Sequence, residues 1–131
     1  MTPPPMAPTG SPMQERETGS EPVRLVRIEV RPHERAGDPR GDALRKQAAS
    51  IGVRAGAVRS ALVYLIEGML SDADVERIRA RLLTNSVLET SIVGASGSRA
   101  DERTIEVHPL PGVMDPVAQT VRATIVELTG V

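Results

Sequence analysis

The sequence contains the same short unit twice, at a fixed spacing. Residues 28–30 read Ile-Glu-Val, and the same three residues recur at 105–107, 77 positions later. In both copies a proline stands two residues after the valine, and an Asp-Pro pair follows at 38–39 and at 115–116. A whole strand, loop and helix repeated at constant offset indicates one supersecondary module used twice. The chain is therefore expected to hold one complete module and the opening of a second.

Each copy predicts a strand followed by a capped helix. Apolar residues alternate with charged ones over 26–30, the period of two that is typical of a strand with one buried face. Asp38 is expected to be the N-cap of the next helix, because Pro39 then takes the first helical position, where its missing N–H costs nothing. Asp115 is expected to cap the second-copy helix in the same way.

Both predicted helices carry an apolar stripe at helical spacing, as expected for helices that pack on a sheet. In the first helix the stripe consists of Leu44, Ala48 and Ile51, and in the second of Val117, Val121, Ile125 and Leu128. A third helix is expected to start at Ser71, with Asp74 reaching back in a capping box. Residues 87–93 predict a third strand and 104–108 a fourth.

Residues 58–67 form the strongest candidate for a central strand. The segment is apolar on both faces, one of which carries Leu62, Tyr64 and Ile66. A strand of an antiparallel sheet with two apolar faces is covered twice, once by its own helices and once by something else. We expect a partner subunit to supply the second cover. The pattern leaves open which face is the interface, and the candidate interface residues are Ala61, Val63 and Leu65.

These elements predict an α+β fold, a two-layer sandwich in which a mainly antiparallel sheet carries helices on one face. Its element order is similar to the split-βαβ, or ferredoxin-like, folds. Residues 1–22 form a proline-rich tail that we expect to be disordered, because it cannot bury enough apolar surface to offset the entropy of ordering. The expected organisation then runs through a module at 23–93, a loop at 94–103 and the start of the second repeat, strand plus helix, at 104–131.

The composition argues against several classes of function. Sixteen basic and 17 acidic side chains give a net charge of -1, which favours neither nucleic acid nor an anionic membrane as partner. Tyr64 is the sole aromatic residue, so an RNA-binding domain with its stacking platforms is disfavoured. The absence of cysteine excludes disulfides, thiolate zinc sites and a thiol nucleophile, and it fits a cytoplasmic location.

The residues that could carry catalysis have simpler explanations. Asp38 and Asp115 could form an acid–base pair only if they met in a cleft, whereas each already stands where a helix needs a cap. His33 and His108, the two histidines, lie outside any metal-ligand spacing. We therefore predict no catalytic, cofactor-binding or metal-binding residue in this chain.

Several motifs, in order along residues 26–131, resemble one protein family. They are Asp38-Pro39 with Gly41, the Tyr-Leu-Ile-Glu-Gly of 64–68, Leu82-Leu83 with Asn85 and Val87, and the Pro-Gly-Val-Met-Asp-Pro-Val-Ala-Gln of 111–119. The sequence resembles the PurS subunit of phosphoribosylformylglycinamidine synthase, and more closely the PurS-like N-terminal region of long PurL chains. The last of the motifs is long and distinctive, while the others gain weight from their order.

The resemblance implies a non-catalytic adaptor in purine biosynthesis. The synthase is a ligase that uses ATP and glutamine to convert formylglycinamide ribonucleotide into its amidine, and this chain would bridge its glutaminase (PurQ-type) and synthase (PurL-type) subunits. ATP and Mg would act on the synthase subunit, and the adaptor would assemble with itself through the sheet. A separate subunit and a part of a longer chain both fit. The alternative from another class is a small-molecule-sensing regulatory domain of the ferredoxin-like type.

Overall fold

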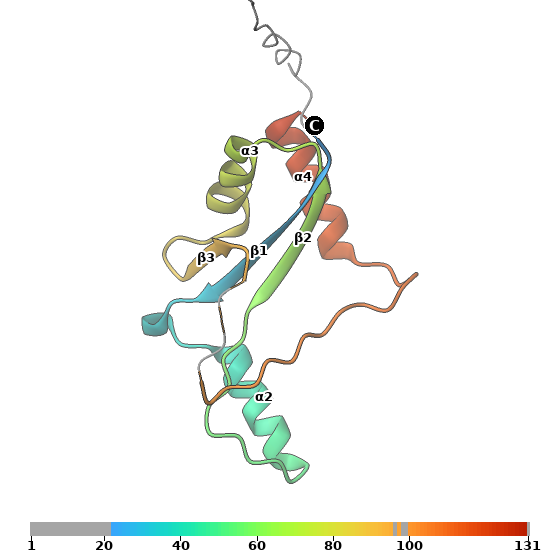
Figure 1. The fold of residues 1–131 in the computed structure, drawn as a ribbon. Helices are drawn as coiled ribbons and strands as arrows, with labels where there is room; N and C mark the ends of the chain where they lie inside the picture. The colour runs from blue at the N-terminus through green and yellow to red at the C-terminus, as the bar shows by residue number, and fades with distance from the viewer. Residues whose placement is uncertain (1–21, 96, 98–99, 131) are drawn as a thin grey trace, which may run out of the picture.

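The computed structural model describes residues 22–95, 97 and 100–130 (Figure 1). The tail expected to be disordered over 1–22 lies outside the described residues except for Pro22. The described elements are three strands, three α-helices, a 3₁₀ turn η2 (Glu34–Ala36) and a π-helical segment η3 (Ile78–Leu83).

The sheet has the order β2-β1-β3, with both pairs antiparallel. Strand β1 (Arg24–Pro32) lies in the centre, between β2 (Leu62–Gly68) and β3 (Glu89–Val93). Ile28 of β1 is paired with Tyr64 on one side and with Val93 on the other.

The strand predicted over 58–67 is therefore shorter and differently placed. It begins at Leu62 and forms an edge of the described sheet, so the expectation of a central strand was wrong. The shortening has a local cause, because the backbone N–H of Ser60 donates to the side chain of Asp38 instead of joining the sheet. The first part of the predicted strand thus belongs to the connection between the first helix and the sheet.

One face of the sheet is covered by two helical rods, which confirms the predicted two-layer α+β architecture (Figure 1). The first rod is α3 (Asp72–Arg77), which continues directly into η3, and the second is α4 (Pro116–Thr129). Side chains from the sheet and both rods form a single core: Val26, Ile28, Val30, Leu70, Val75, Ile78, Leu83 and Ile125. Burial of this apolar area is the main favourable term that holds the layers together.

Helix α2 (Pro39–Ser50) does not join this layer. Figure 1 shows α2 pointing away from the sheet, beyond the end of the strands. The stripe expected to pack on the sheet is largely exposed, with Leu44 at 47% and Ile51 at 78% of full exposure. Among the residues of α2, all of which are described, only Gly41 is buried. The position beside η3 is filled instead by α4, whose Val121 and Leu128 pack against the core.

The strand expected over 104–108 is not formed. These residues run outside the sheet, between α2 and α4 in Figure 1. A strand requires a neighbour in register, and in the described sheet 104–108 pairs with none of the three strands. Of the predicted second repeat, the structure therefore shows the helix without the strand. None of the helices in the described ranges combines the length and the apolar content needed to cross a bilayer.

Candidate functional site

The sheet face opposite the helices, here called the open face, presents apolar side chains to solvent. Directly paired residues of an antiparallel ladder share a face, so Val63 and Leu65 lie on the same side as their partners Glu29 and Arg27. The core residues of β1 alternate with these and point the other way. The exposed apolar residues of the open face are Leu25 at 67%, Val63 at 36%, Leu65 at 54% and Ile92 at 40%.

The predicted interface residues thus fall in two places. Val63 and Leu65 lie in the middle of β2 on the open face. Ala61 precedes the strand by one residue and is partly covered. The sequence could not distinguish the two faces of β2, and the structure does so by packing Tyr64 and Ile66 against the core.

A row of charges crosses the centre of the open face along β1. Glu29 is only 3% exposed, although its carboxylate lies on the side away from the helices. The Nη1 atom of Arg27 lies 2.9 Å from Oε1 of Glu29, and Nε of Arg31 lies 2.6 Å from Oε2. A buried carboxylate is tolerable only when it is paired and hydrogen-bonded, and the two guanidinium groups meet that need.

The charged row also extends to the edge of the sheet. Arg27 donates a further hydrogen bond of 2.7 Å to the carbonyl oxygen of Gly94, the residue that follows β3. The pattern Arg-x-Glu-x-Arg at 27–31 was visible in the sequence, where it reads as an ordinary solvated face. The sequence signal for the buried Glu29 is the placement of opposite charges two residues apart on a strand, since such residues share one face.

The three predicted helix caps have the expected geometry at the helix starts. The Asp115 side chain accepts a bond of 3.0 Å from the Ala118 N–H. Ser71 and Asp74 form a reciprocal capping box with bonds of 3.0 and 3.2 Å. Asp38 caps α2 by accepting from the Gly41 N–H at 2.8 Å. Asp38 and Asp115 thus serve two different helices, each in a capping role.

Asp38 does more than cap α2, because it also binds the segment that leads into β2. Its carboxylate accepts from the Ser60 N–H at 2.5 Å and from the Ser60 hydroxyl at 2.6 Å. Burial alone would raise the pKa of Asp38, but the hydrogen bonds from Ser60 and Gly41 outweigh it and lower the pKa below its ordinary value. We call these contacts of Asp38 with Ser60 and Gly41 the Asp38 clasp.

Gly41 completes the clasp sterically. A Cβ atom at this position would lie 2.2 Å from the carbonyl oxygen of Val58, so no other residue fits without a shift of the backbone. The start of α2 therefore crosses closely over residues 58–60. The sequence predicted the cap of this helix, but the role of Gly41 becomes visible only from the tertiary contact.

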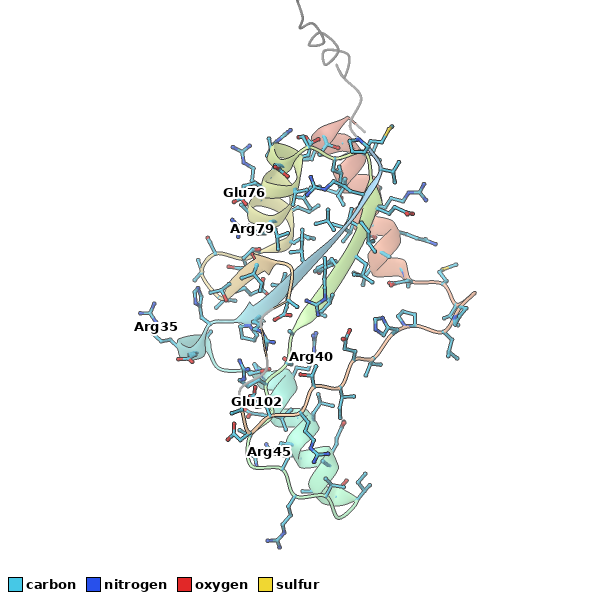
Figure 2. All side chains as sticks on the ribbon, viewed as in Figure 1. Arg35, Arg40, Arg45, Glu76, Arg79 and Glu102 are labelled. Carbon is cyan, nitrogen blue, oxygen red and sulfur yellow. The ribbon has the colours of Figure 1, made fainter. Side chains whose placement is uncertain are left out.

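Two further ion pairs position the surrounding segments. Arg59 forms two hydrogen bonds of 2.7 Å with the Glu102 carboxylate, which connect the loop before residue 104 to the segment that precedes β2. The hydrogen bond to Glu102 raises the pKa of Arg59. Figure 2 shows Glu76 and Arg79 on the α3–η3 rod, where they pair with each other. Arg79 also donates a hydrogen bond of 2.9 Å to the Ser91 hydroxyl and so connects η3 with β3.

The described residues offer little that resembles a catalytic centre. They contain no group of three or more His, Asp or Glu residues able to hold a metal ion. His33 lines two surface hollows next to Arg35, and both open broadly to solvent. The feature that stands out is the open face, with apolar edges on either side of a neutralised charged row. A surface of this kind is typical of protein–protein contact.

The fold and this face define a class of protein, a small two-layer α+β module with one sheet face exposed to solvent. No family model and no curated protein matches the sequence. Among solved structures, the chain is similar to the PurS subunit of FGAM synthetase, MTH169, with a TM-score of 0.48 and 20% identity over 55% of this chain and 90% of that one. It is also similar to PurS from Thermus thermophilus, with a TM-score of 0.47 and 22% identity over 56% of this chain and 94% of that one.

Proposed function

We propose that this chain is a non-catalytic adaptor, either a subunit or a domain, of phosphoribosylformylglycinamidine synthase, which is also called FGAM synthetase. In this role it associates with itself through the sheet and bridges the glutaminase and synthase subunits in the cytoplasm. The observation that carries the proposal is the open face, where Val63 and Leu65 are exposed in the middle of an edge strand. The ordered motifs that resemble PurS, above all residues 111–119, supply the identity of the assembly.

The open face supports association because its charges are already neutralised. Glu29 is paired on both sides, so a partner surface does not have to remove an isolated carboxylate from water. The flanking apolar residues are exposed to about half their area, and their burial would provide the driving force. An edge strand such as β2 also has one side open to pairing with another chain.

The adaptor role assigns the chemistry to the partners. ATP, Mg and the ribonucleotide bind to the synthase subunit, and glutamine is hydrolysed by the glutaminase subunit. The role of this chain is then to position the two partner subunits. In agreement with this, Asp38 and Asp115 serve as helix caps and Glu29 forms an ion pair. The complete complex is a glutamine-hydrolysing ligase of purine biosynthesis, while the isolated chain has no activity of its own.

The test is a co-purification with a matched pair of variants. Leu65→Asp places a charge in the centre of the open face, whereas Val126→Asp places one on α4 at a comparable exposure of 48%. Wild type and Val126→Asp should co-purify with the glutaminase and synthase subunits in the presence of glutamine and nucleotide, and Leu65→Asp should not. Circular dichroism verifies that both variants are folded. Failure of the wild-type chain to associate would overturn the proposal.

A further inference from the structure

Residues 104–108 have the side-chain pattern of a strand but no partner in the described sheet. Ile105 and Val107 are the two most exposed large apolar residues in the described part of the chain, at 85% and 89%. Glu106 and His108 contact each other, with Oε1 of Glu106 3.4 Å from Nε2 of His108. Residues two apart share a side in an extended chain, whereas in a helix they do not face each other. The segment therefore already has one apolar side and one polar side, as a strand does.

Strand β2 has an edge to which such a segment can be added. One side of β2 pairs with β1, and no described strand pairs with its other side. The outward N–H and C=O groups of an edge strand are a template for a further strand. Leu62 lies opposite the core residue Val30, on the side that faces the helices, and is still 41% exposed. A further strand with apolar residues on that side would cover it.

The inner side of β2 already pairs with the same tripeptide. Residues 28–30 of β1 lie opposite 62–64 in antiparallel register, and residues 105–107 are again Ile-Glu-Val. In this register the two apolar residues of the tripeptide point toward the helices and the glutamate toward the open face. The other edge strand, β3, is a poorer match for the apolar side, because it places the polar Ser91 opposite Val30. The residues of β2 therefore suit the segment better than those of β3.

We propose that residues 104–108 of one copy pair antiparallel with the outer edge of β2 in a second copy, with Glu106 opposite Val63, so that two copies exchange strands. The ion pair between Arg59 and Glu102 is the reason for a second copy, because it holds residue 102 close to the start of β2. In the proposed register Thr104 lies beside Leu65, six residues beyond Arg59. The two residues after Glu102 span only about 7 Å. The segment of the same chain thus starts at the wrong end of β2, whereas a two-fold related copy supplies it in the required direction.

The experiment uses cross-linking, since the chain has no native cysteine. Glu106→Cys chains are mixed with Val63→Cys chains and treated with a bis-methanethiosulfonate linker that spans about 5 Å, roughly one strand spacing. The matched control replaces Val63→Cys with Ile92→Cys, which lies on the same face at a similar exposure, 40% against 36%. Both residues lie opposite Glu29, Val63 on β2 and Ile92 on β3, so the two mixtures compare the two edges of the sheet. We expect a cross-linked pair with Val63→Cys and none with Ile92→Cys.

Variants of the segment test the pairing itself. Ile105→Asp together with Val107→Asp removes its apolar side and should abolish the cross-link, whereas Leu110→Asp, at a residue that is 73% exposed outside the segment, should retain it. Equal yields at the two edges, or a cross-link that persists in the double variant, would overturn the proposal. A single chain carrying both Glu106→Cys and Val63→Cys that cross-links within itself at high dilution would also overturn it, because the segment would then join its own sheet.

The strand exchange goes beyond the proposed adaptor role and does not rest on it. It joins two copies at the edge of the sheet, and its test requires this chain alone, whereas co-purification requires the glutaminase and synthase subunits. A cross-link in a chain that fails to co-purify would refute the adaptor role and support the exchange. Co-purification of a chain that forms no cross-link would refute the exchange and support the adaptor role.

Discussion

Asp115 and Asp38 offer a comparison in which the more heavily bonded residue should matter less for global stability. Asp115 makes one capping bond, to the Ala118 N–H, and Asp38 makes three bonds through Gly41 and Ser60. Helix α4, however, contributes Ile125 to the core, whereas α2 contributes no apolar side chain to it. A cap stabilises the whole protein only to the extent that its helix is coupled to global unfolding.

The magnitudes follow from the contacts. Asp115→Ala should lower the free energy of unfolding by about 1 kcal/mol, the usual cost of a lost N-cap, which corresponds to a decrease in Tm of roughly 4 °C for a domain of this size. Asp38→Ala loses a cap and a charge-assisted contact to Ser60, about 2 kcal/mol, but this loss should appear as local opening of α2.

Two measurements separate the local from the global effect. Urea denaturation should show the larger decrease for Asp115→Ala, while amide hydrogen exchange should show the larger loss of protection in α2 for Asp38→Ala. The conservative variants Asp115→Asn and Asp38→Asn serve as controls, because asparagine also caps helices. If Asp38→Ala lowers the global free energy of unfolding as much as Asp115→Ala does, α2 is coupled to the core and the placement of this helix is wrong.

The remaining predictions concern the Asp38 clasp. Gly41→Ala should displace the start of α2, because the added Cβ would lie 2.2 Å from the carbonyl oxygen of Val58. Gly56→Ala should be nearly neutral, since nothing lies within 4 Å of its Cβ position. Amide hydrogen exchange of α2 in the two variants tests this difference. The clasp should also depend on pH. The pKa of Asp38 is lowered on folding from its ordinary value of 3.8, so its contribution is fully present above that value and is lost as the pH falls through the lower folded-state pKa. The difference in α2 exchange rates between wild type and Asp38→Asn should therefore be largest above pH 3.8 and shrink as the pH falls below it. A constant difference between pH 3 and pH 6 would contradict the ionised clasp.

Local sequence signals predicted the helix starts and the buried face of β1 well. An Asp before a Pro, or a Ser three residues before an acidic residue, determines a helix start through contacts within one turn. The alternation over 26–30 likewise requires only the geometry of a strand. Asp38, Ser71 and Asp115 therefore have the capping geometry that these patterns indicate.

Sequence patterns could not determine which repeated element would occupy a shared position. Leu44 and Val121 each lie six residues after the aspartate that caps their helix. The sequence of neither helix by itself indicates that Val121, and not Leu44, packs on the sheet. The segment 104–108 similarly has the pattern of a strand, but whether it pairs depends on whether the fold brings it beside the edge of a sheet, which its own residues do not state. The burial of Glu29 also follows from its neighbours across the sheet and from two arginines, not from its own residue type.

Whether the open face is a contact surface can be measured by methyl NMR of the wild-type chain with a soluble paramagnetic probe. Signals of Val63 and Leu65 are compared with those of Val126, which has similar exposure in the single chain. In the assembled protein we expect the methyl groups of Val63 and Leu65 to be protected from the probe while Val126 remains accessible. Equal broadening of all three residues at concentrations where the wild-type chain is assembled would contradict it.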